Sequence, residues 1–191
     1  MTNLVTLDEY KTAENIQSVK EDARINSLLA SVSALVKTYC GNSILSATHT
    51  EEFSINWGTN LVQLTESPVN SIIEVKTRDT YDESYSAVSS GEYFLEKSTD
   101  TVYSVTKNGV AKNWPTGPAS VQIQYTAGYA STPEDLKLAV FDLITYYLKD
   151  EHKARQTLAG ASIQNQSSSS QRNNVAFPDH IKRVLDLYKN F

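Results

Sequence analysis

Histidine and cysteine are the side chains that could bind a transition metal or act as a nucleophile, and this chain has few of them. The three histidines, His49, His152 and His180, are spaced too widely for any two to share one face of a helix as metal ligands. Cys40 is the single cysteine, so it can complete neither a zinc site nor an internal disulfide. No base or orienting group stands close to it in sequence. We therefore expect no metal, no cofactor and no catalytic residue, and we interpret Cys40 as a small buried hydrophobic side chain.

Carboxylates occur in two clusters that could carry acid–base chemistry. Glu51 and Glu52 are adjacent in a predicted strand, where neighbouring side chains face opposite sides and cannot cooperate. The sequence Asp150-Glu151-His152 follows a predicted helix and is typical of a solvated surface patch. The seven glycines are scattered, so no phosphate-binding loop is formed. Because catalytic groups can meet from distant parts of a chain, a small enzyme with dispersed residues stays open as an alternative.

Composition and charge restrict the class of protein further. The chain has 191 residues, 40% hydrophobic and 20% charged, which is typical of a globular protein. No apolar run is long enough for a bilayer span, and the N-terminus lacks a signal-peptide pattern, so we expect synthesis in a cytoplasm and no membrane partner. Residues 1–148 carry ten basic and eighteen acidic side chains, and residues 149–191 carry seven and four. An acidic body argues against a dedicated nucleic-acid binder.

Two helices are predicted before the middle of the chain. Thr6 and Glu9 have the spacing of a capping box, which indicates a short helix starting at this point. A longer helix is expected from Ser18 to Gly41, where glycine is a typical stop. Its apolar positions recur every three or four residues, and they are Ile25, Leu28, Leu29, Val32, Leu35, Val36 and Tyr39.

Residues of about 47–129 change to a β pattern. Phe53, Ile55 and Trp57 alternate with polar residues, then Gly58 to Asn60 turns the chain toward Leu61–Leu64, which predicts a hairpin. Further strands are expected over residues 71–77, 93–95, 102–105 and 120–126, with a turn at Asn108-Gly109. The predicted fold class is therefore α+β: a helical core, residues 1–46 and 130–157, with an inserted antiparallel β region.

A third helix is expected to begin after Thr132, as N-cap, with Pro133 in the first helical position. One apolar stripe runs through Leu136, Ala139, Val140, Leu143, Ile144 and Tyr147. Phe141, Tyr146 and Leu148 lie off this stripe. A surface helix usually has one apolar face, so we predict that these three residues form a subunit interface or contact the β region.

The last part of the chain combines a polar tract with an amphipathic segment. Residues 158–176 are rich in Ser, Gln and Asn and are predicted to be a flexible linker. Residues 177–191 are predicted to form a helical anchor that binds a partner through Ile181, Lys182, Arg183, Val184, Leu185 and Tyr188. The alternative, in which this helix folds back onto its own domain, stays equally open.

The order of these parts resembles the head-to-tail connector (adaptor) family of tailed bacteriophages. The similarity rests on the segments Leu7–Lys11, Asp22–Gly41, Val121–Tyr129, Pro133–Lys137 and Phe177–Lys189. The resemblance implies a structural, non-enzymatic virion protein at the head–tail junction, assembled as a homo-oligomeric ring that usually has twelve subunits. It also implies a portal protein and a stopper or tail protein as partners, with double-stranded DNA passing through the ring without specific binding. The segment 177–191 would then be the portal anchor.

Other readings of the same residues are a neck stopper or tail completion protein, and a monomeric β-rich module of a phage tail that binds a sugar or peptide through its aromatic strands.

Overall fold

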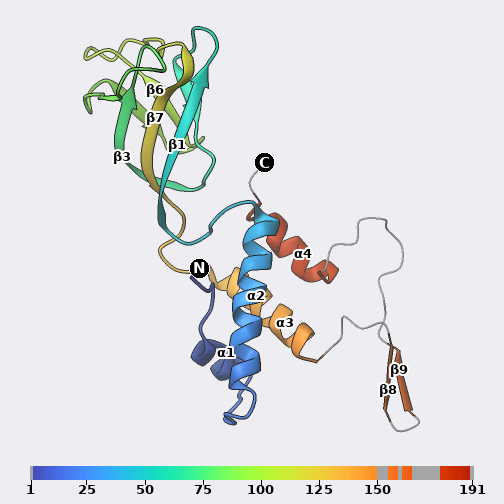
Figure 1. Ribbon diagram of the computed structural model, residues 1–191. Coiled ribbons are helices and arrows are strands. Elements are labelled where there is room, and N and C mark those ends of the chain that lie inside the picture. The colour runs from blue at the N-terminus through green and yellow to red at the C-terminus, as the bar shows by residue number, and fades with distance from the viewer. Residues whose placement is uncertain (1, 150–154, 159–160, 165–176, 190–191) are drawn as a thin grey trace. The chain divides into compact units, whose positions relative to one another are not determined.

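The computed structural model describes residues 2–149, 155–158, 161–164 and 177–189, and they form the expected α+β fold (Figure 1). The described chain divides into two compact units. The helical unit comprises residues 2–41 and 132–149 together with 177–189, and the β unit comprises residues 42–131. Within the described residues, no helix combines the length and apolar character needed to cross a membrane.

The helical unit contains α1 (Leu7–Ala13), α2 (Asp22–Cys40), α3 (Glu134–Leu148) and α4 (Asp179–Asp186). The capping box at α1 is confirmed, because the Thr6 hydroxyl accepts from the Glu9 amide while the Glu9 carboxylate accepts from the Thr6 amide. Gly41 ends α2 with a φ of 72°, as glycine permits. The predicted start of α2 at Ser18 is wrong by four residues. Ser18 instead accepts from the Lys20 amide in a turn.

The core of the helical unit lies between α2, α3 and the N-terminal segment. Fully buried side chains come from all three, and they are Leu4, Val5, Tyr10, Ile25, Leu29, Val32, Val36, Leu136, Val140, Leu143 and Ile144. The first stripe predicted for α3 therefore faces this core. The prediction of Thr132 as an N-cap is wrong, since its buried hydroxyl donates to the Leu4 carbonyl and ties the N-terminal segment to the start of α3.

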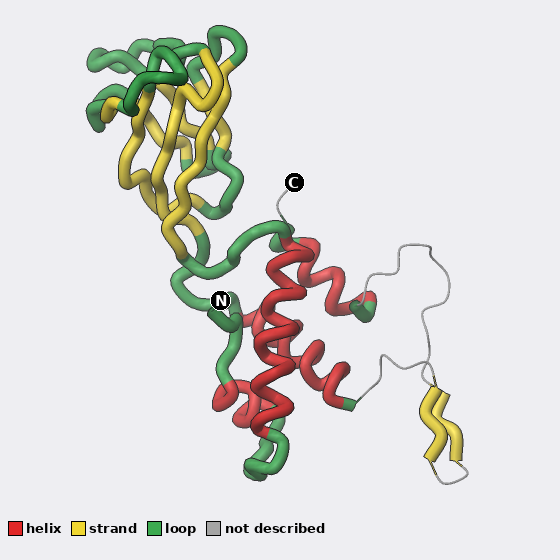
Figure 2. Tube along the Cα trace, viewed as in Figure 1, coloured by secondary structure: helices red, strands yellow, loops and turns green. Residues whose placement is uncertain are grey.

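The β unit consists of two antiparallel sheets, which Figure 2 shows as the yellow strands of one compact body. The four-stranded sheet has the order β1 (Ala47–Ile55), β7 (Gly117–Ala127), β3 (Val69–Thr77) and β4 (Ser86–Ala87). The three-stranded sheet has the order β2 (Leu61–Gln63), β6 (Thr101–Ser104) and β5 (Tyr93–Glu96). Their inner faces share one core that includes Val62, Leu64, Val75, Val102, Trp114, Val121, Ile123 and Tyr125.

The hairpin predicted around Gly58 is wrong. β1 pairs with β7, and β2 pairs with β6, so the two strands on either side of this turn belong to different sheets. The alternation of residues 53–57 identifies a strand but says nothing about its partner. The turn at Asn108-Gly109 is confirmed, because Gly109 has a φ of 75° and its amide donates to the Thr106 carbonyl.

The chain enters and leaves the β unit through two segments that are bonded to each other. The Tyr129 amide donates to the Ile44 carbonyl over 2.7 Å, and the Ser46 amide donates to the Tyr129 carbonyl over 2.8 Å. Gly128, with a φ of 103°, allows the closest approach, because a β-carbon there would lie 2.6 Å from the Leu45 carbonyl carbon. Glu66 holds the entering segment by accepting from the Ser43 amide and hydroxyl.

Part of the predicted flexible linker has regular structure. β8 (Arg155–Leu158) and β9 (Ala161–Gln164) form a two-stranded antiparallel sheet. Residues 158 and 161–164 of the predicted linker thus lie in paired strands, while the flexibility of this segment in the free protein stays a prediction. The remainder of the predicted linker, residues 159–160 and 165–176, lies outside the described residues.

Candidate interaction surfaces

The C-terminal helix α4 packs on its own unit. Ile181 and Leu185, two of the predicted portal-binding residues, are buried against α2 and α3. The Leu185 carbonyl accepts from the Cys40 thiol over 3.7 Å, and burial raises the pKa of that thiol to about 11. Phe177 meets the Tyr39 ring edge-on, with centroids 5.0 Å apart. The prediction that the apolar face of this helix awaits a partner is therefore corrected in favour of the alternative, because α2 and α3 already cover it.

Polar contacts at the rim of α4 add to this packing. The Tyr39 hydroxyl donates to Asp186, and the Tyr188 hydroxyl donates to Asp135, each over 2.5 Å. Desolvation and the bond to Asp186 raise the pKa of Tyr39 to about 12. Since Tyr39 lies on α2 and Asp135 on α3, the two bonds tie the helix to both of its neighbours.

The other side of α4 faces outward and carries charges of both signs, with Lys182 and Arg183 beside the exposed Asp179 and Asp186. Lys182 and Val184 are half-buried, whereas Arg183 is exposed. Leu187, just beyond the helix, is 76% exposed. Four of the six predicted portal-binding residues, Lys182, Arg183, Val184 and Tyr188, thus keep part of their surface accessible, so this outward side is a candidate contact surface.

The three predicted subunit-interface residues on α3 are all half-buried. Phe141 lies against Tyr10 of α1 with ring centroids 5.9 Å apart. The Tyr146 ring meets the Tyr147 ring at 5.5 Å, and Leu148 ends the helix. The same side of α3 is joined to α1 by a 2.9 Å hydrogen bond between the Tyr10 and Thr145 hydroxyls. The short helix α1 therefore covers part of the second apolar face of α3, which the sequence pattern did not indicate.

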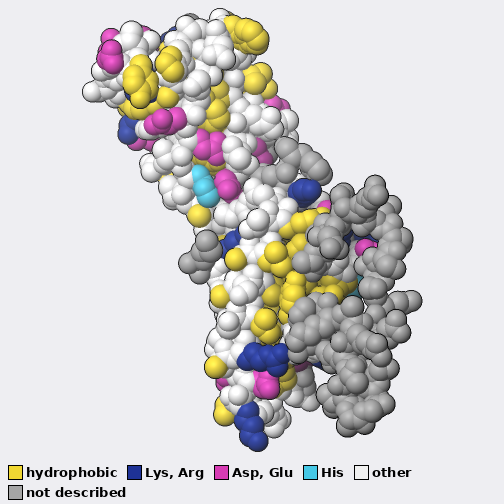
Figure 3. Space-filling model, turned by 45° about the vertical axis from the view of Figure 1, so that its right-hand side comes forward, with side chains coloured by type: hydrophobic (Ala, Val, Ile, Leu, Met, Phe, Trp, Pro, Cys, Tyr) yellow, Lys and Arg dark blue, Asp and Glu magenta, His cyan; other side chains and the backbone are white. Residues whose placement is uncertain are grey.

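The two sheets of the β unit present very different outer faces. The outer face of the four-stranded sheet is mostly polar, and its paired positions are Thr48, Thr50, Glu52, Ser71, Glu74, Lys76, Gln122, Gln124 and Thr126. Ile73, at the register irregularity of β3, is 50% exposed. On the outer face of the three-stranded sheet, Leu61 and Phe94 both stand directly opposite Tyr103. Leu61 is 43% exposed and Phe94 is 58% exposed. Hydrophobic side chains are visible at the end of the β unit drawn uppermost in Figure 3.

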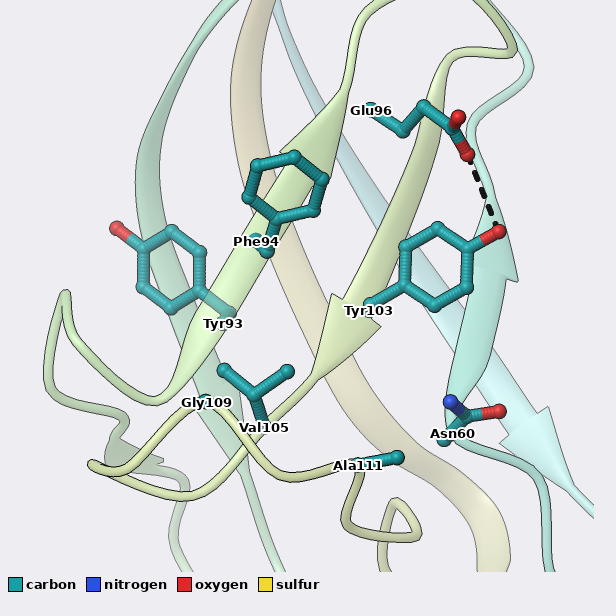
Figure 4. Close-up of a pocket in the computed structure, with 8 residues that line it drawn as sticks. All are labelled: Asn60, Tyr93, Phe94, Glu96, Tyr103, Val105, Gly109 and Ala111. Atoms are coloured by element: carbon teal, nitrogen blue, oxygen red, sulfur yellow. Dashed lines mark hydrogen bonds between the residues drawn. The ribbon is translucent and has the colours of Figure 1, made fainter.

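We call the row formed by Leu61, Tyr103 and Phe94 the apolar face. It borders a hollow of about 530 Å³, whose lining is drawn in Figure 4. This lining also includes Asn60, Tyr93, Glu96, Val105, Gly109 and Ala111. The Glu96 carboxylate accepts from the Tyr103 hydroxyl and from the Thr99 hydroxyl, each over 3.2 Å.

The sequence alone did not predict this surface, although three consecutive residues of β5 indicate it. Tyr93, Phe94 and Leu95 are consecutive large apolar residues in one strand. Tyr93 and Leu95 pack on the core, so Phe94 between them must point outward. No group of three or more His, Cys, Asp or Glu side chains that could hold a metal ion occurs within the described residues.

One family of known proteins matches nearly the whole chain. The sequence model of a family described as "Head completion protein" matches residues 3–191. The head completion protein of Escherichia phage T5 is 27% identical over 70 residues, which are 36% of this chain. That match spans 38% of the T5 protein, well under two thirds of its length.

Solved structures of gene transfer agent (GTA) particles contain chains with a similar fold. A chain in the "Neck of empty GTA particle computed with C6 symmetry" has a TM-score of 0.61 and 19% identity, with 98% of this chain and 90% of that chain covered. A chain in the "Neck of native GTA particle computed with C12 symmetry" has a TM-score of 0.59 and 19% identity, with 100% and 96% covered. At these identities the likeness is one of fold.

Proposed function

Because the chain belongs to the head completion protein family, we propose that it is a structural protein of the virion neck, located between the portal and the tail of a phage or phage-like particle. The single observation that carries this proposal is the family match over residues 3–191. The fold supports this location, since the similar chains come from structures described as necks of GTA particles. Head completion is a structural role, and no chemical reaction is part of the proposal.

A ring with a central DNA channel is the finer form of this proposal. Twelve copies are favoured by the twelvefold symmetry given for one of the similar neck structures. Residues 1–148 carry eight more acidic than basic side chains, eighteen against ten. An acidic wall repels phosphate groups and would let double-stranded DNA slide instead of gripping it.

Portal binding is proposed for the outward side of α4 and not for its buried side. Lys182 and Arg183 would meet carboxylates of the portal, while Val184 and Leu187 would supply apolar contact. Rim charges of this kind mainly set the encounter rate and the register. Because all copies in a ring act together, each contact can be weak while the ring is held firmly. A stopper or tail protein is the partner proposed for the opposite side of the ring.

Joining of heads to tails is the direct assay of this function. Heads assembled without the chain should carry a portal but fail to join tails, and adding the purified chain should restore joining. An Arg183→Glu variant should restore it less well, whereas Lys20→Glu, a charge reversal on an exposed residue before α2, should act like the wild type. Normal joining by heads that lack the chain would rule the proposal out.

A further inference from the structure

An antiparallel sheet that faces solvent normally carries polar side chains on that side. The four-stranded sheet follows this rule apart from Ile73, whereas the three-stranded sheet carries the row Leu61, Tyr103 and Phe94 on that side. We infer that the apolar face, Leu61, Tyr103 and Phe94, binds the β unit of a neighbouring copy of this chain. This inference rests on the ring assembly proposed above and names one of its contacts.

The register of the strands makes the apolar face continuous. Leu61 of β2 and Phe94 of β5 flank Tyr103 of β6, since each is its directly paired residue. Side chains in such positions lie about 5 Å apart at their β-carbons, so the three form one row across the sheet. Figure 4 shows the rings of Phe94 and Tyr103 on adjacent strands, with Glu96 turned toward the Tyr103 hydroxyl. Contiguous exposed apolar surface of this kind marks interaction sites.

A small-molecule site explains this surface less well than a protein contact does. Ligand pockets combine apolar walls with a few polar groups that converge on the ligand. Here the Glu96 carboxylate is already bonded to the hydroxyls of Tyr103 and Thr99. Its two hydrogen bonds within the chain leave it less available to bind a ligand.

The outer face of the four-stranded sheet is suited to be the other half of the contact. A ring is closed by a heterologous interface, in which two different surfaces of each copy meet. The two outer faces lie on opposite sides of the β unit, so face-to-back stacking can continue from copy to copy. On this polar face Lys76 lies 2.6 Å from Glu74, while Glu52 accepts from the neutral Gln122 over 2.9 Å and keeps its charge. The pairing of Lys76 with Glu74 limits the repulsion between acidic copies at this contact.

Photo-crosslinking in assembled particles tests the inference. Benzoylphenylalanine is placed at Phe94 of the full-length chain, and the particles are irradiated. The expected product has twice the 21.2 kDa mass of the chain, with the crosslinked peptide coming from β1, β3 or β7 of a second copy. Tyr81 is the matched control, because it is an aromatic residue of 64% exposure in the segment between β3 and β4, off both outer faces.

The outcomes separate this inference from the proposed function. A crosslink from position 94 to a different virion protein, or a chain whose mass stays unchanged, overturns the inference and leaves the neck location intact. Equal self-crosslinking from positions 94 and 81 would mean unspecific contact and also overturns it. Particles that do not contain the chain at all would remove the proposed function and this inference together.

Discussion

Glu9 both caps helix α1 and forms an ion pair with Lys137 of α3. The hydrogen bond from the Thr6 amide, and then the contact with Lys137 at 3.1 Å, hold the pKa of the Glu9 carboxyl below its usual value of 4.5. A carboxyl whose pKa is lowered in the folded state stabilises the fold above its unfolded-state pKa. That contribution is lost as the pH falls through the folded-state pKa.

The first prediction uses Glu9→Gln, which keeps the hydrogen-bonding shape but removes the charge. At neutral pH the variant should be less stable by up to about 1 kcal/mol, because the carboxylate is 40% exposed and solvent screens its ion pair. Urea unfolding of both proteins at a series of pH values measures the difference. It should vanish in the acid range, and a difference that stays constant down to about pH 3 would contradict the assignment.

Gly128 is the residue that lets the two connecting segments of the β unit approach each other. Gly128→Ala should lower the free energy of unfolding by about 2–4 kcal/mol, because the added β-carbon collides with the Leu45 backbone and the φ of 103° is strained for alanine. Gly91→Ala is the matched control, since among the described residues nothing lies within 4 Å of its added β-carbon. Thermal unfolding of the two variants provides the comparison, and equal melting temperatures would show that the close approach is unimportant.

At the scale of elements, the docking of α4 is the feature with the clearest energetic consequence. Leu185→Ala should destabilise the free chain by about 3 kcal/mol, because it leaves a cavity between α4 and α2. Leu187→Ala, two residues further on at a site 76% exposed, should change stability by less than about 0.5 kcal/mol. Chemical denaturation measures both. If the two variants are equally stable, α4 is not docked in solution.

The second face of α3 gives a prediction about assembly. Phe141→Asp should leave the free chain folded, since the ring is only half-buried against Tyr10, and it should lower the number of copies incorporated into particles. Circular dichroism of the free chain and quantitative mass spectrometry of particles provide the two readouts. Unfolding of the free chain would make Phe141 a core residue and reject the interface assignment.

Patterns among neighbouring residues predicted most helices and strands. Contacts between residues far apart in the sequence could not be predicted from such patterns. Thr6 with Glu9 and Gly41 marked helix ends because caps act within one turn. The partner of β1 is β7, about seventy residues away, so alternation around Phe53 could not reveal it. The amphipathic pattern of residues 181–188 predicted an apolar face, but which surface covers it depends on packing with α2 and α3. The apolar face of the three-stranded sheet likewise emerged only when the strand register was known.

In the whole molecule, each of the two units has its own candidate contact surfaces. The helical unit carries the charged outward side of α4 and the half-buried second face of α3. The β unit carries one apolar and one polar outer face. These are the surfaces at which the proposed ring would make its contacts.

Averaged electron microscopy of the particle neck tests the proposed location of this chain. Density is expected beneath the portal, repeated around the channel with twelvefold symmetry, and the helical unit and the β unit should fit into it as separate bodies. Particles made without the chain should lack this layer. Identical neck density with and without the chain, or the chain in another part of the particle, would rule out a role in the neck.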